Sequence, residues 1–371
     1  MRRQRQRGFT LIELMVGSIV TFITVLAVSA AFLGYTQSFY TQAGIRGGQA
    51  SLRHTHQLVV RNLRMAGYGM DPPNAFGFPA GWRDDATRNR SDRLVFRMRD
   101  PAFATLASAI SGTTVTLPAD KPLPALMRKG QIFQIACPGG LALTYVQLSA
   151  DAPAGAFTMS LESPTGTFPR LNNFSAPCFG IASGGLPMHV FKIDVYDYSI
   201  QFVDDDGMPA TPGRPYLFRR HGLDEKDPNA FGEPVAEDIE ALRVIFLREN
   251  GTEFIPNPGA EAPDYGTPLN DPKRLSDHPA NIRAVRVGLV ARTSTRDAGI
   301  NPGLMNLIPK FGGRPELPGA YGFRRVLSEM SVQIRNMRSA QLPVPIYSND
   351  AATVNACKGA MPDDELNCAG G

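Results

Sequence analysis

The feature that most constrains this chain is a long apolar run close to its N-terminus. Residues 1–8 hold four arginines and no acid, and residues 9–34 hold a single charged side chain, Glu13. At about 1.5 Å per helical residue, the uncharged residues 14–34 are long enough to cross a hydrocarbon core of roughly 30 Å. The sequence therefore predicts a transmembrane helix over residues 9–34.

The arginines before this run predict the orientation of the helix. Positive charges stay on the cytosolic side of a membrane, so the rest of the chain is expected to be exported. The run is longer than the apolar region of an ordinary secretory signal. We expect a single-pass membrane protein with its N-terminus on the cytosolic side and the rest of the chain outside.

Glu13 requires an explanation, because a charged side chain deep in a membrane helix costs roughly 2.5 to 3.5 kcal/mol on insertion scales. One interpretation is that Glu13 lies close enough to the cytosolic edge to reach water. The other is that the carboxylate has a function, which is the usual reason for an ionisable group inside a membrane. Composition does not separate the two.

Residues 7–16, RGFTLIELMV, resemble the class III leader of type IV pilins and pseudopilins. The resemblance implies that residues 1–8 are a basic leader peptide, which a prepilin peptidase cuts between Gly8 and Phe9 before it methylates the new amine of Phe9. It also implies that the helix lies in a bacterial inner membrane with the globular domain in the periplasm, and that Glu13 is the assembly glutamate. A carboxylate on one subunit would neutralise the amine of its neighbour inside an apolar helical core, where unpaired charges are costly.

Composition places the rest of the chain among globular proteins. It has 371 residues, of which 43% are hydrophobic, with 38 basic and 34 acidic side chains. Removal of the leader with its four arginines leaves 34 basic against 34 acidic groups. A nearly neutral protein gives no electrostatic reason to expect nucleic acid as a partner.

The four cysteines, Cys137, Cys178, Cys357 and Cys368, all lie in the part expected to be exported, where disulfides form. Four cysteines allow three pairings. We favour Cys357 with Cys368, which are near neighbours in a terminal tail, and this leaves Cys137 with Cys178. The alternative is free buried thiols.

A second helical half is predicted over residues 35–66. Glycines at positions 44, 47 and 48 weaken it and make a bend plausible, and the segment GYGMDPPN at 67–74 ends it. Its apolar stripe repeats every seven residues, with two further members between. The stripe consists of Ile45, Leu52, His56, Val59, Leu63 and Ala66.

Residues 67–345 are expected to form a β-rich, mostly antiparallel domain with long loops, and residues 346–371 a cystine-closed tail. The fold class is therefore α+β, a long helix packed on a pilin-type globular domain. In residues 282–292, Val285, Val287, Leu289 and Ala291 lie on one face and Arg286 and Arg292 on the other, which predicts one buried and one wet face. The predicted strands are 94–98, 113–117, 131–136, 142–148, 156–161, 189–202, 239–249, 282–292 and 323–337.

Two proline- and glycine-rich stretches, 256–279 and 302–318, are predicted to be surface loops. The five histidines and four cysteines have no metal-ligand spacing, and no nucleophile elbow or paired-carboxylate motif is present. We therefore expect no catalytic residues, no metal and no cofactor.

The order of elements resembles PilW-type minor pilins in particular, through residues 61–69, 285–293 and 324–336. This resemblance implies a structural subunit that helps to prime pilus assembly and lies near the tip, at the cell surface. Its partners would be other minor pilins, the major pilin and a large tip adhesin. Two alternatives remain: a J-type pseudopilin of a type II secretion system, and a membrane-anchored periplasmic enzyme or binding protein. The task of the filament stays open.

Overall fold

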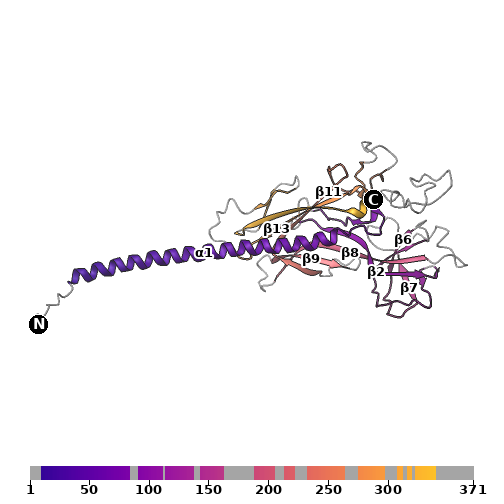
Figure 1. The fold of residues 1–371 in the computed structure, drawn as a ribbon, viewed down its shortest axis with the longest axis horizontal. Coiled ribbons are helices and arrows are strands. Elements are labelled where there is room, and N and C mark those ends of the chain that lie inside the picture. The colour runs from indigo at the N-terminus through magenta and orange to yellow at the C-terminus, as the bar shows by residue number, and fades with distance from the viewer. Residues whose placement is uncertain are drawn as a thin grey trace, which may run out of the picture.

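One long helix projects from a β-rich body (Figure 1). The computed structural model describes residues 10–83, 91–111, 113–137, 143–162, 188–204, 213–221, 232–263, 275–296, 307–311, 316–319 and 322–339. The helix and the large antiparallel sheets confirm the predicted α+β class.

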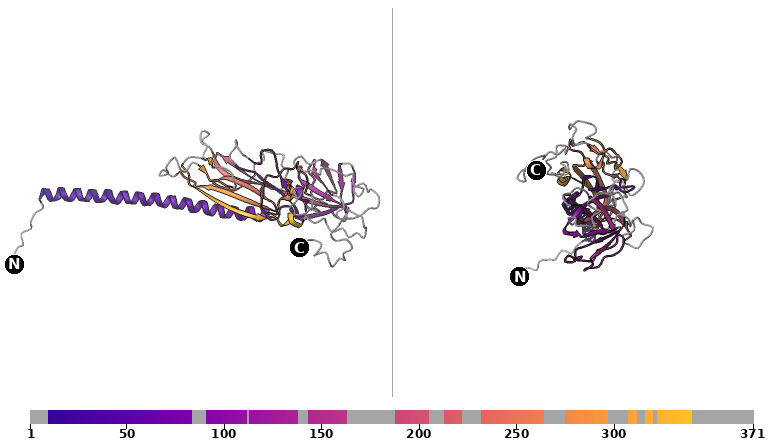
Figure 2. Two further views of the ribbon diagram at one scale, coloured as in Figure 1. Left: turned by 90° about the horizontal axis from the view of Figure 1, so that it is seen from above. Right: turned by 90° about the vertical axis from the view of Figure 1, so that its right-hand side faces the viewer.

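Helix α1, Leu11–Leu63, is continuous and runs without interruption through its three central glycines. The expected bend is therefore not seen, and Figure 2 shows a nearly straight rod. Only the second half of α1 packs on the body. The predicted stripe is confirmed there, since its members from position 52 onward are buried. The buried members are Leu52, His56, Val59, Leu63 and Ala66.

Two glycines turn the chain after α1. Gly67 and Gly69 have φ of +76° and +68°, a region that other residues rarely adopt. Gly69 also lies against a side chain, because a Cβ there would be 2.3 Å from Cδ of Arg99. The short helix η1, Pro72–Asn74, then leads the chain into the sheet.

The larger sheet has ten strands, centred on the long strand β8, Met188–Val203. β2, Leu94–Ala107, pairs with one edge of β8, while β5 and β9 share the other edge. All of these pairings are antiparallel. The remaining strands are β1 Phe76–Gly77, β3 Ala109–Ser111, β4 Thr114–Thr116, β5 Ile132–Ala136, β6 Leu143–Leu148, β7 Thr158–Glu162, β9 Arg214–His221 and β10 Glu233–Glu237.

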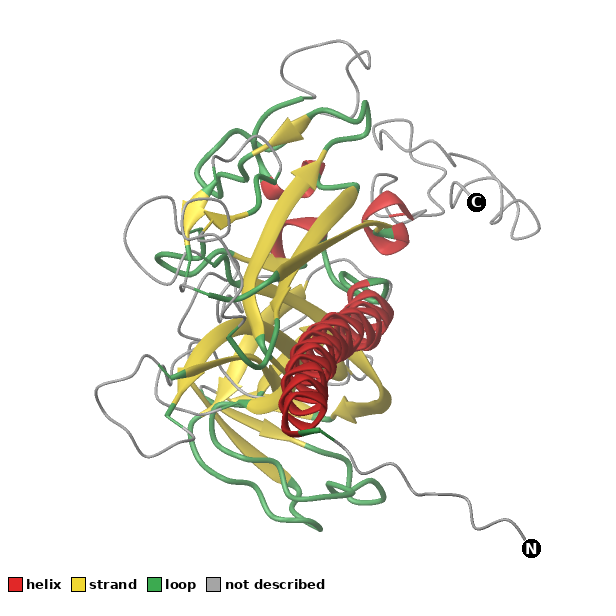
Figure 3. Ribbon diagram, turned by 90° about the vertical axis from the view of Figure 1, so that its left-hand side faces the viewer, coloured by secondary structure: helices red, strands yellow, loops and turns green. Residues whose placement is uncertain are grey.

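A second antiparallel sheet has four strands in the order β12, β11, β13, β16. Figure 3 shows α1 end-on beside the strands. A separate pair is formed by β14, Leu307–Ile308, and β15, Leu317–Pro318. The four strands are β11 Ile239–Leu247, β12 Glu253–Phe254, β13 Ala284–Arg292 and β16 Arg325–Gln333.

The body has two main hydrophobic cores. One lies between α1, the four-stranded sheet and the halves of β2 and β8 nearest to it. The other lies among β3 to β7, the first part of β8 and the last part of β2. We call this second part the distal lobe, because it lies at the end of the body away from the N-terminus (Figure 1).

The structure corrects two further predictions and adds strands that were not predicted. The second face of β13 is only partly wet. Ile308 and Phe311 from the predicted loop 302–318 cover it at Val290 and Gly288, and a Cβ on Gly288 would lie 2.9 Å from the Phe311 ring. Arg286 stays partly exposed. The strand predicted over 323–337 ends at Gln333, and helix α2, Arg335–Ser339, follows it. Strands β9 and β10 were not predicted. The predicted tail 346–371 lies outside the described residues.

Candidate membrane-anchoring and assembly site

No described part of the body packs on the first half of α1. Every residue from Thr10 to Tyr35 is exposed, although most of them are apolar. Among the described helices, α1 is the one long and apolar enough to cross a membrane. The fold thus leaves uncovered the segment that the sequence predicts to span the bilayer.

Glu13 lies in the first turn of α1, where it forms a capping box with Thr10. The backbone N–H and the hydroxyl of Thr10 both donate to Oε2 of Glu13, each over 3.1 Å. The backbone N–H of Glu13 donates in return to Oγ1 of Thr10 over 3.3 Å. These bonds satisfy backbone donors that a helix start leaves without partners.

The hydroxyl groups farther along this half of α1 are satisfied within the helix. Ser18, Thr21 and Thr24 each donate to a carbonyl three or four residues earlier, over 2.8 Å. Thr36 does the same over 2.7 Å. A hydroxyl that is bonded to its own helix does not need water, so these side chains are compatible with a bilayer.

Aromatic side chains mark the end of the apolar half. Tyr35, Phe39 and Tyr40 are all largely exposed. Tyrosine and tryptophan are enriched where membrane meets water, because one end of each ring is apolar and the other polar. The boundary of the membrane segment is therefore expected between Gly34 and Tyr40.

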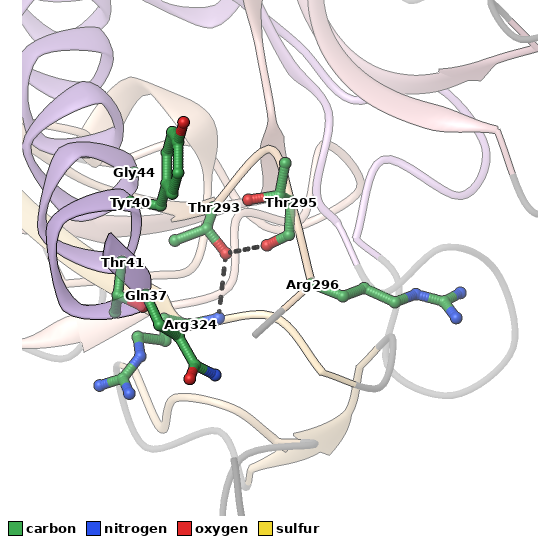
Figure 4. A pocket seen from close by; sticks show the side chains of 8 residues that line it. All are labelled: Gln37, Tyr40, Thr41, Gly44, Thr293, Thr295, Arg296 and Arg324. Carbon is green, nitrogen blue, oxygen red and sulfur yellow. Dashed lines mark hydrogen bonds between the residues drawn. The ribbon is translucent and has the colours of Figure 1, made fainter. Parts of the chain in front are cut away.

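A pocket of about 180 Å³ lies where α1 meets the body, directly above these aromatic residues. In Figure 4 the side chains of Gln37 and Arg324 are drawn at its edge, whereas Arg296 extends away from it. The hydroxyl of Thr293 accepts from the backbone N–H of Arg324 over 3.3 Å and donates to the carbonyl of Thr295 over 2.9 Å. These bonds hold together the two body segments that line the pocket, the one after β13 and the one before β16.

Two polar contacts join the second half of α1 to the body. Nε2 of His56 donates to the carbonyl oxygen of Ser328 over 3.0 Å, and Asn62 donates to the Tyr198 hydroxyl over 2.8 Å. Burial lowers the pKa of His56, although the Ser328 carbonyl opposes this, and burial raises the pKa of Tyr198 to about 12. Both groups are held neutral near pH 7, as a buried interface requires.

Of the other predicted site residues, the structure describes only Cys137. Gly8 and Phe9 lie outside the described residues, as do Cys178, Cys357 and Cys368. Cys137 directly follows β5, is buried and is disulfide-bonded, with a partner outside the described residues. Within the described ranges no group of His, Cys, Asp and Glu side chains could hold a metal ion.

Sequence reasoning missed Thr10 and the pocket. The signal for Thr10 was present, because a threonine three residues before a glutamate is the sequence signature of a capping box. The pocket had no such signal, since its residues come from α1, from the segment after β13 and from the start of the β16 region.

One family model matches the start of the chain, including the first part of α1. Residues 3–29 match the family model described as the prokaryotic N-terminal methylation motif. A type IV-like pilin, TTHA1219 from Thermus thermophilus, is similar in structure, with a TM-score of 0.32, 13% sequence identity, and coverage of 78% of this chain and 97% of that one. No curated protein matches by sequence. A motif of this kind implies processing by a prepilin peptidase and assembly with other pilins, and the match extends into the exposed apolar half of α1.

Proposed function

We propose that this chain is a minor pilin of the PilW type, which helps to prime assembly of a type IV pilus and comes to lie near its tip. One observation carries the proposal: the methylation motif at residues 3–29 coincides with the start of a helix whose first half is fully exposed. Such a half-helix needs an apolar environment. A membrane supplies it before assembly, and the packed helices of a filament supply it afterwards.

In this proposal the peptidase cuts between Gly8 and Phe9, and the new amine of Phe9 lies one residue before the cap. Thr10 donates two hydrogen bonds to Oε2 of Glu13, while no described residue donates to Oε1. The carboxylate is thus held at the helix start with one oxygen able to accept from an incoming amine. Intrachain hydrogen bonds lower the cost of carrying the charge in the bilayer until a neighbouring subunit pairs with it.

The PilW assignment is supported by where its three resembling segments lie. β13 and β16 pair along their whole length. The segment that ends α1 lies beside the end of β16, since Asn336 Nδ2 donates to the carbonyl of Ala66 over 3.2 Å. Residues 61–69, 285–293 and 324–336 therefore form one continuous unit. The second half of α1 packs on β13 and β16 of this unit, and it also contacts β10.

The proposed partners are the prepilin peptidase, other minor pilins, the major pilin and a large tip adhesin. The test is recovery of the chain, by immunoblot, in pili sheared from cells. A strain without prepilin peptidase should lose the chain from this fraction. Absence from wild-type pili, with co-purification of secretion-system components, would favour the J-type pseudopilin. An uncut chain that stays in the membrane would favour the anchored enzyme or binding protein.

We further propose that Cys178 is the disulfide partner of Cys137, and that Cys357 and Cys368 close the tail 346–371. The burial of Cys137 in the distal lobe supports a disulfide with a stabilising role. Peptide mapping without reduction tests the pairing, which should yield these two cross-linked peptides. A peptide joining Cys137 to the tail would contradict it.

A further inference from the structure

We infer that Asn250 is a site of spontaneous covalent modification, at which the side-chain amide is lost and aspartate or isoaspartate takes its place. Asn250 and Gly251 lie in the turn between β11 and β12, and the sequence contains no other Asn-Gly pair. The chemistry concerns this turn alone, so the inference is independent of whether the chain is assembled into pili.

The turn leaves this pair accessible for reaction. Asn250 and Gly251 are exposed, and Gly251 has φ of +79° with no atom within 4 Å of an added Cβ. The backbone N–H of Gly251 donates to the carbonyl of Arg248 over 3.0 Å, and this bond has to open before the nitrogen can react. It lies at the end of a strand pair of only two residues, where local opening costs little.

Two hydrogen-bond donors are directed at the oxygen on which charge would develop. The backbone N–H of Thr252 donates to Oδ1 of Asn250 over 3.0 Å, and the Thr252 hydroxyl donates to it over 2.7 Å. Nη1 of Arg248 donates to that hydroxyl over 3.2 Å and so orients it. Donors in this position polarise Cγ and stabilise the oxyanion of a tetrahedral intermediate, as an oxyanion hole does.

The reaction needs no reagent other than water. The nitrogen of Gly251 attacks Cγ of Asn250, a five-membered succinimide ring closes, and the side-chain nitrogen leaves as ammonia with the proton of the N–H. Nucleophile and amide belong to adjacent residues, so no second reactant has to be brought in for this step. One water molecule then opens the ring, either at the side-chain carbonyl to give aspartate or at the backbone carbonyl to give isoaspartate.

Isoaspartate would disturb the packing of β12. It adds a methylene group to the backbone of a turn whose length sets the register of the hairpin. Phe254 of β12 is buried in the core beneath α1, and the guanidinium carbon of Arg248 lies 4.4 Å from the centroid of its ring. We therefore expect the modification to loosen β12 and to expose this ring.

The test uses the purified full-length chain in detergent micelles, incubated at mildly alkaline pH. Peptide mapping by mass spectrometry follows the replacement of an amide by a carboxyl group, and an isoaspartyl methyltransferase labels the isoaspartate. We expect Asn250 to be converted before every other asparagine. Thr252→Val, which loses the hydroxyl and keeps the N–H, should be converted about five-fold more slowly, the factor given by one hydrogen bond of about 1 kcal/mol.

Asn257 is the matched control in the same chain. It is exposed, and its Oδ1 accepts from the backbone N–H of Gly259 over 3.0 Å, as the Asn250 side chain accepts from Thr252. The next residue, Pro258, has no N–H that could attack, so Asn257 should stay intact. Pro258→Gly creates a second Asn-Gly pair and should make Asn257 convert as well, more slowly than Asn250 because no hydroxyl donates to its side chain.

Three results would overturn the inference. The first is conversion of Asn250 that is no faster than that of the other asparagines. The second is conversion of Asn257 in Pro258→Gly while Asn250 stays intact, which would show that the β11–β12 turn protects its pair. The third is conversion in Thr252→Val at the wild-type rate or faster, because the hydroxyl would then restrain the side chain instead of assisting the attack.

Discussion

Thr10 and Glu13 close the first turn of α1 on each other, each accepting a hydrogen bond from the backbone N–H of the other. The glutamate therefore has two possible contributions, the cap of its own helix and the charge offered to a neighbouring subunit. The capping box needs only an acceptor, whereas the pairing with an amine needs a carboxylate. The two contributions are separable by substitution.

Glu13→Gln keeps an amide oxygen that can cap the helix and removes the charge. We expect this variant to be processed normally and to be incorporated into pili as poorly as Glu13→Ala. Thr10→Ala, which loses part of the cap and keeps the charge, should be incorporated far better, at a helix cost of about 1 kcal/mol. Quantitative immunoblots of sheared pili measure this. Incorporation of Glu13→Gln at the wild-type level would assign Glu13 to capping alone.

Asp238 links the two sheets. It lies between β10 of the larger sheet and β11 of the smaller one, with φ of 60°, and both of its oxygens accept from Arg214 of β9, over 3.0 and 2.5 Å. This carboxylate raises the pKa of Arg214. Asn tolerates the left-handed conformation better than Ala does. We expect Asp238→Asn to lower the free energy of unfolding by about 1 to 3 kcal/mol and Asp238→Ala by a further ~1 kcal/mol. Equal losses in chemical denaturation would remove the conformational argument.

Gly69 tests the turn that follows α1. Gly69→Ala suffers from its positive φ and also forces Arg99 out of its place, where Nε donates to Gln134 over 2.6 Å. Gly81 is the matched control, because its φ is +73° and no atom lies within 4 Å of an added Cβ. Gly69→Ala should cost about 1 to 3 kcal/mol more than Gly81→Ala, as overpacking typically does. Similar melting temperatures for the two variants would contradict the contact with Arg99.

His56 makes the contact between α1 and the body sensitive to acid. The unfolded chain has an ordinary histidine pKa of about 6.5, and burial lowers the pKa in the folded state. The folded state therefore binds fewer protons, and stability is lost as pH falls through the unfolded pKa. Protonation would also place an N–H on Nδ1, which is buried and has no hydrogen-bond partner in the described part of the chain.

His56→Gln keeps a donor for the Ser328 carbonyl and does not titrate. We expect the wild type to lose more stability than this variant between pH 7 and pH 5 in urea unfolding. Burial also lowers the pKa of His278, so His278 makes both proteins less stable in acid. Its effect is the same in the wild type and the variant, and it cancels when their losses of stability are compared. Parallel losses would show that His56 is not the sensitive group.

The sequence predicted those elements whose pattern is local. Helix α1 shows its buried stripe every seven residues, and strands such as β13 show alternating valines. β9 and β10 were missed because their arginines and glutamates look like a solvated loop. In the fold Arg220 pairs with the buried Asp197 of β8, and Arg219 pairs with Glu233 of β10. When charged side chains on a strand pair with residues that are distant in the sequence, the local sequence pattern does not indicate a strand.

Contacts with residues that are distant in the sequence also explain why the predicted wet face of β13 is partly wrong. Ile308 and Phe311 cover its second face from a stretch whose prolines and glycines predict a surface loop. Glu13, by contrast, was singled out from a short motif, and its partner in the capping box, Thr10, lies three residues away. Its assembly role stays a prediction. The pocket at the junction was not predictable, because its lining is brought together only when the strand ends meet α1.

The central claim is that this chain is cut and assembled as a pilin, and the mass of its N-terminal peptide tests that claim most directly. We predict that the chain recovered from sheared pili begins at Phe9 and that its amine carries one methyl group. A chain that keeps Met1 and the arginines of residues 2–7 in the same fraction would contradict the account.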